Sequence, residues 1–177
     1  KNAIIHGGER AAACYAVISY VTYIVQMLIQ GIGDGSQPLI SRYFGADRQD
    51  MVKRLRNMAF ITAEITAAVS VILLIAGSEA VSVFFGMSGQ GVSDVEATMP
   101  YFAAGMIFMA IERVMTSVFY AMDRNGYAYT LIYGELILMG ILATVVLPPF
   151  MGVTGVWLSV PVAQAVLAVL SVLLLRK

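Results

Sequence analysis

The feature that most constrains this chain is a stretch without charge. From Leu136 to Leu175, forty residues pass without an Asp, Glu, Lys or Arg. At a helical rise of about 1.5 Å per residue this stretch is roughly 60 Å long, or two crossings of a hydrocarbon core about 30 Å thick. Pro148 and Pro149 divide it where a chain leaving one helix must turn to enter another. The stretch therefore predicts two membrane-spanning helices joined by a short turn.

The composition extends this prediction to the whole chain. Hydrophobic residues make up 59% of it, charged residues 12%, and the mean hydropathy is +0.81. A soluble fold with so few charged residues would lack the polar surface to cover itself. Cys14 is the single cysteine and His6 the single histidine, so the sequence offers no disulfide framework and no metal-ligand cluster. We expect no metal site and no cofactor.

Five segments of about 20 to 26 residues have the length and composition of spanning helices. Such runs are too long and too uniformly apolar for the alternating strands of a membrane barrel. We therefore predict an all-α integral membrane bundle of about five transmembrane helices. The segments are Ala11–Gly33 (extendable to Ser41), Asn57–Ala76, Ala97–Met122, Asn125–Leu147 and Val153–Leu175.

The connecting loops indicate an orientation. Residues 42–56 contain five basic side chains, whereas residues 77–96 contain three acidic ones and no Lys or Arg. Eight of the eleven basic residues fall on one side, which the positive-inside rule makes cytoplasmic. We expect a multi-pass plasma-membrane protein with residues 42–56 and the C-terminus in the cytoplasm. Because the crossing count is odd and Lys1 opens the chain, we expect residues 1–177 to be a fragment of a longer protein.

Four acids and one arginine lie within or beside the spans. Glu112 and Glu135 are about equally far from the turn between their two segments, so an antiparallel hairpin places both, with Arg113, at similar depth. Asp34 and Glu64 share a second depth nearer the cytoplasmic face. Arg113 would pair with Glu135 or Glu112 as a structural ion pair between helices.

One interpretation leaves at least one of these acids without a partner. A carboxylate in low dielectric readily keeps a proton, so Glu64, Glu112 or Glu135 could couple Na⁺ or H⁺ to transport. Asp34 is the weaker candidate, because its span could end before it and leave it in water.

Several uncharged side chains are candidates for a cavity or for packing. Gln26 and Gln30 lie one helical turn apart and would either bond a neighbouring helix or line a water-filled path. Tyr23 and Met109 are adaptable side chains that suit a cavity for varied compounds, although packing in the core or against lipid is the simpler interpretation.

A glycine-rich segment precedes the basic loop. Its glycines at 31, 33 and 35 permit close helix approach or a bend, and Pro38 would add a kink. Gly45 suits a helix C-terminus, and Asp47 could cap the helix that follows. The segment does not fit a phosphate-binding loop, because no strand precedes it and no Lys-Ser/Thr follows.

The string Gln37-Pro38-Leu39-Ile40-Ser41, followed by Gly45-Ala46 and a basic stretch, closely resembles a motif of the multidrug and toxic compound extrusion (MATE) family. That motif follows the family's eighth helix. Weaker matches, in the right order, are Val118–Met122 to the end of its tenth helix and Pro148–Trp157 to the turn into its twelfth. Arg42-Tyr43-Phe44 replaces the motif's usual tyrosine-asparagine-tyrosine, so this chain lacks the amide of that asparagine.

The resemblance implies a partial C-terminal lobe, with one helix and the N-terminal lobe missing. It also implies alternating-access efflux of small organic, often cationic, compounds in exchange for Na⁺ or H⁺. Expected partners are membrane lipids and the remaining lobe, and no nucleic acid.

Other functions have less support in the sequence. A lipid-linked oligosaccharide flippase of the same superfamily would need basic residues in its cavity, and only Arg113 qualifies. A membrane enzyme should show clustered His, Cys or Asp at a membrane face. The sequence has no such cluster, so we do not expect this chain to be an enzyme. A channel would need a filter-like or pore-charge pattern, and none is visible.

Overall fold

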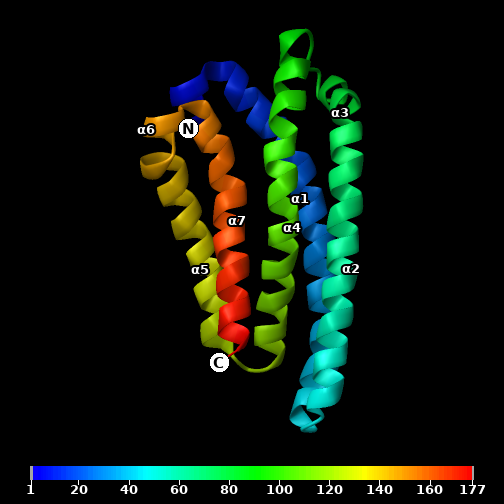
Figure 1. Ribbon diagram of the computed structural model, residues 1–177. Helices are drawn as coiled ribbons and strands as arrows, with labels where there is room; N and C mark the ends of the chain where they lie inside the picture. The colour runs from blue at the N-terminus through cyan, green and yellow to red at the C-terminus, as the bar shows by residue number, and fades with distance from the viewer. Residues whose placement is uncertain (1, 177) are drawn as a thin grey trace.

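The computed structural model describes residues 2–176, which form a bundle of long helices (Figure 1). Within them, five segments are long and apolar enough to cross a membrane, as predicted. Lys177, one of the eight basic residues predicted to lie on the cytoplasmic side, is outside the described residues. In chain order the elements are α1 (Asn2–Gly45), α2 (Gln49–Ala76), α3 (Ser78–Phe84), α4 (Gln90–Ala121), α5 (Asn125–Ile141), the π-helical segment η1 (Leu142–Val146), α6 (Pro148–Met151) and α7 (Val153–Leu175).

Helix α4 is the centre of the bundle. It packs against α1, α2, α5 and α7, and 72% of its most apolar stretch is buried, compared with 6% for α5 and η1. The peripheral helices leave large apolar side chains such as Ile65 and Leu136 exposed. Such surfaces suit lipid or a second protein body rather than water. The polar groups that α4 carries are therefore held inside the lobe.

Small side chains let α2 approach α1 and α4. Ala63 and Ala67 are fully buried in an apolar cluster that also contains Ile29 of α1 and Met106 of α4. Met109 lies in the same cluster and is 4% exposed. The structure therefore favours core packing for Met109, because its face of α4 meets α1 and α2, over the cavity role considered from the sequence.

The helix ends confirm some of the turns and caps predicted from the sequence and contradict others. Helix α1 ends at Gly45, as predicted. The capping role expected for Asp47 is wrong: α2 begins at Gln49 behind Arg48 with no side-chain cap, and Asp47 adopts a left-handed backbone with φ 54°. Helix α1 continues through Pro38, and its helical geometry is interrupted instead at Gly8, where φ is 71°.

The two ends of the bundle hold different connections. The α1–α2 turn, the α4–α5 turn and the C-terminus lie at one end, and α3 and α6 lie at the other (Figure 1). Near α6, the chain reverses at Gly152, whose φ of 57° suits glycine. The turn expected at Pro148 and Pro149 is confirmed.

Candidate functional site

A polar network lies around Arg113 in the middle of α4. Its Nη2 donates hydrogen bonds to both carboxylate oxygens of Glu135 on α5, at 2.9 and 2.7 Å. Both side chains are largely buried. The ion pair expected between these neighbouring helices is therefore confirmed, and Glu135 is the closer partner.

Glu112 is held less tightly. Its side chain is 0% exposed, and Oε1 accepts a hydrogen bond of 2.8 Å from Thr116 one turn further along α4. Oε2 lies 3.4 Å from Nε of Arg113, but neither atom makes an aligned hydrogen bond. We regard this contact as an ion pair by distance only, because hydrogen bonds need good alignment. Arg113 thus lies between two carboxylates, one firmly bonded and one loosely.

Gln164 of α7 completes the network, and sequence reasoning missed it. Its Nε2 donates to Oε1 of Glu135 at 2.8 Å, so the network joins α4, α5 and α7. Its own Oε1 is buried without a hydrogen-bond partner among the described residues. The available signal was an amide in the middle of an otherwise apolar span, where a polar group needs a partner.

A second polar cluster surrounds Asp34 between α1 and α4. Oδ1 of Asp34 accepts hydrogen bonds from Gln30 Nε2 at 2.8 Å, Gln37 Nε2 at 3.4 Å and Ser117 Oγ at 3.2 Å. Gln37 of the motif, Gln30 and Asp34 therefore belong to one site. Helix α1 continues past Asp34 to Gly45, but Asp34 is exposed, so the expectation that the membrane span ends before it stays a prediction.

Gly33 allows this contact between the two helices. A Cβ at this position would lie 2.6 Å from Oγ and 3.1 Å from Cβ of Ser117, so only glycine lets α1 come this close to α4. At Gly31 and Gly35 a Cβ would meet nothing within 4 Å. Of the three glycines, Gly33 is the one that serves close helix packing.

The remaining sequence candidates are not gathered into either cluster. Glu64 is half-buried on α2, with Oε1 buried and unpaired among the described residues. Gln26 is half-buried, while Tyr23 is 57% exposed on α1. Pro38 and Gly45 of the motif are exposed.

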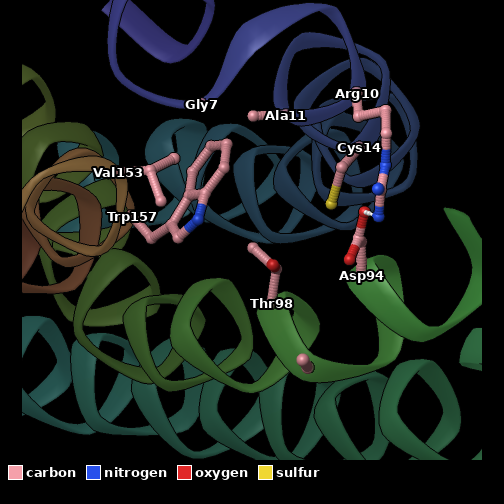
Figure 2. A pocket seen from close by; sticks show the side chains of 9 residues that line it. Gly7, Arg10, Ala11, Cys14, Asp94, Thr98, Val153 and Trp157 are labelled. Carbon is pink, nitrogen blue, oxygen red and sulfur yellow. Dashed lines mark hydrogen bonds and ion pairs between the residues drawn. The ribbon is translucent and has the colours of Figure 1, made fainter. Parts of the chain in front are cut away.

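A pocket of about 340 Å³ lies at the other end of the bundle, between α1, α4 and α7 (Figure 2). Arg10 bridges the helices there: Nη2 lies 2.6 Å from Oδ2 of Asp94, and Nη1 donates to Gln90 at 2.9 Å. Cys14 and Trp157 also line the pocket. The sequence did not indicate this pocket, because its residues come from segments far apart in the chain.

The class of protein follows from the fold: five long apolar helices, packed around a central one that carries a buried polar network, match one part of a known transporter architecture. An outward-facing multidrug resistance MATE family transporter of the MOP superfamily is similar, with a TM-score of 0.90 at 16% identity over 98% of this chain and 40% of that one. An inward-facing one gives 0.89 at 17% identity over 98% and 41%. A MATE structure in the bent conformation gives 0.89 at 16% identity over 99% and 39%.

The chain thus spans about 40% of the length of the structures that it matches, and the MATE resemblance carried by Gln37 and Pro38 is confirmed at the level of the fold. No curated protein sequence gives a significant match. The family model described as "Lipid II flippase MurJ" matches residues 9–177, and the chain belongs to that family, which is part of the same MOP superfamily.

Proposed function

We propose that this chain is one lobe of an alternating-access transporter that exports small organic, often cationic, compounds in exchange for Na⁺ or H⁺. A second lobe would complete the transporter. The observation that carries the proposal is Glu112: a fully buried carboxylate near the middle of a spanning helix, with one hydrogen bond from Thr116 and a loose contact to Arg113.

The network around Glu112 suits ion coupling. Arg113 is already satisfied by two hydrogen bonds to Glu135, which Gln164 also anchors. Glu112 can therefore gain or lose a proton, or bind Na⁺, while the ion pair that joins α4 and α5 stays intact. Alternating-access proteins place their coupling sites at this depth.

The similarity to two transporter states supports a rocking mechanism. The lobe superposes almost equally well on an outward-facing and an inward-facing transporter, with TM-scores of 0.90 and 0.89. A lobe whose internal fold fits both states is suited to move as a rigid body about a central cavity.

A lipid-linked substrate is the second candidate, and family membership favours it. Flipping of such a substrate would need basic side chains along the path. Arg113 is the only Lys or Arg within the five spans predicted from the sequence, and two carboxylates already flank it. We therefore place organic-compound export first. A lipid-flipping assay on the complete transporter separates the two functions.

Glu112→Gln tests the proposal. The amide retains the shape and a hydrogen-bond acceptor for Thr116 but cannot carry a proton or an ionic charge. In vesicles containing the complete transporter, with an imposed pH or Na⁺ gradient, we expect this variant to bind substrate but to lose gradient-driven efflux. Glu96→Gln, an exposed position near the start of α4, is the matched control and should transport normally.

Gradient-driven efflux by Glu112→Gln at the unmodified rate would show that Glu112 is not the coupling residue. Loss of folding, monitored by size-exclusion chromatography, is a separate result. In that case Thr116→Val, which removes only the hydrogen bond to Glu112, should still alter the ion dependence of efflux.

A further inference from the structure

We propose that a groove between α4 and α7 is a binding site for an anionic phospholipid: one acyl chain lies in the groove, and the phosphate meets Arg176 at its end. The inference goes beyond the proposed function, because it depends neither on the exported compound nor on the coupling ion. The occupant is a lipid of the surrounding bilayer whose headgroup has a phosphate and a net negative charge.

The groove is a hollow of about 260 Å³ between two helices that pack side by side (Figure 1). Ala168 is small and 4% exposed, whereas the larger Val169 and Leu173 beside it are 61% and 53% exposed. A small buried side chain between large exposed ones makes the surface concave. The lining residues are Phe108, Ile111, Ala168, Val169, Val172, Leu173 and Arg176.

The length of the groove suits the part of an acyl chain that lies in one leaflet. Along α7 the lining runs from residue 168 to residue 176, or about 12 Å at helical rise. Half of a hydrocarbon core is about 15 Å thick. Beyond Phe108, a second apolar hollow of about 370 Å³ continues between the same two helices. The groove therefore has room for a chain that reaches the middle of the bilayer.

Arg176 is the one charged side chain that lines the groove. It directly follows α7, whose 23 residues span about 34 Å, so it lies where the hydrocarbon core meets the headgroups. Its side chain is exposed and makes no hydrogen bond or ion pair among the described residues. A guanidinium can bind a phosphate through two parallel hydrogen bonds. In the expected orientation this end is cytoplasmic, and the cytoplasmic leaflet carries anionic lipids.

The distribution of polar groups favours lipid over the second lobe as the occupant. Between residues 158 and 175, the polar side chains of α7 are Ser159, Gln164 and Ser171, and all three are buried. The exposed side of this part of α7 is therefore entirely apolar, as expected of a surface against lipid. Helix α1 instead exposes Asp34, which suits water or a second protein body.

Photolabelling tests the inference on the purified complete transporter in nanodiscs of phosphatidylcholine. The probe is phosphatidylglycerol with a diazirine on its acyl chain, and mass spectrometry locates the labelled peptides. We expect label on α7 within residues 168–175 and on α4 near Phe108. Phosphatidylcholine with the same diazirine has no net charge and should label these segments about fivefold less, the effect of one basic residue on an anionic lipid.

Arg176→Gln removes the charge at the end of the groove. We expect it to lower labelling by phosphatidylglycerol about fivefold, to the level of phosphatidylcholine. Arg54→Gln is the matched control: it removes the same charge from an exposed position on α2 near the same end of the bundle, and should leave labelling of the groove unchanged.

A second variant leaves Arg176 in place and fills the groove. Val172→Phe enlarges a side chain that lines it, and we expect labelling by both lipids to fall. Val69→Phe, the same change at an exposed position on α2, should have no effect on the groove.

Four results would overturn the inference. They are equal labelling of the groove by the two lipids, unchanged labelling in Arg176→Gln or in Val172→Phe, and an equal loss in Arg54→Gln. The fourth is label on other helices of the unmodified protein but none in the groove, which would mean that protein rather than lipid covers this face.

Discussion

At the residue scale, the buried guanidinium of Arg113 sets the strongest requirement. Arginine does not lose its proton in proteins, so this side chain must keep a carboxylate nearby. Glu135→Gln would remove the negative charge and one of the two acceptor oxygens, so the looser Glu112 would be the remaining carboxylate beside Arg113. We expect the variant to lose about 2 to 3 kcal/mol of stability, the scale of hydrogen bonds to charged groups, and thermal unfolding of the purified transporter measures this.

Replacing both partners provides the control. Arg113→Met with Glu135→Leu removes the charges together, and buried ion pairs can be exchanged for apolar pairs at little cost. Glu112 would then remain, but a carboxyl group can take up a proton, whereas arginine cannot release one. A double variant no more stable than Glu135→Gln would show that the pair is not the source of the loss.

The residue contacts that the sequence predicted are those fixed by hairpin geometry. Arg113 and Glu135 lie on consecutive antiparallel spans, so their distances from the shared turn gave a common depth. Gln164 lies on the next span, and the rotation of α7 about its own axis, which brings it to Glu135, depends on packing in three dimensions. The contact between Asp34 of α1 and Ser117 of α4 depends on packing in the same way.

At the element scale, Gly33 controls the distance between α1 and α4. Gly33→Ala would place a Cβ 2.6 Å from Oγ and 3.1 Å from Cβ of Ser117, so we expect a loss of about 1 to 3 kcal/mol from overpacking. Gly35→Ala is the control, because the site is open and alanine favours helix by about 1 kcal/mol. Thermal unfolding of both variants tests this prediction. Equal stability of the two variants would mean that α1 and α4 can move apart without a loss of stability.

The spans themselves were predictable because length and lack of charge fix a membrane helix without knowledge of its neighbours. Two departures have identifiable causes. Helix α1 begins at Asn2, well before the predicted Ala11, and Arg10 within this extension bonds Asp94 and Gln90 of α4. The π-helical segment η1 precedes Pro148, and no local residue pattern predicted it.

At the scale of the whole molecule, the two ends of the bundle differ in charge. The end with the α1–α2 turn, the α4–α5 turn and the C-terminus carries most of the basic residues, and the end with α3 carries the acidic loop (Figure 1). From the positive-inside rule we propose that the first end is cytoplasmic. The proposed direction of export depends on this orientation.

Cysteine labelling of intact cells tests the orientation. Ser88→Cys, in the exposed loop between α3 and α4, should react with a thiol reagent that cannot cross the membrane. Ala46→Cys, which is also exposed, in the α1–α2 turn, should react only after the membrane is permeabilised. The native Cys14 is 1% exposed, so it should contribute little background and can stay in place. Labelling of Ala46→Cys in intact cells, with Ser88→Cys protected, would reverse the orientation and with it the proposed direction of export.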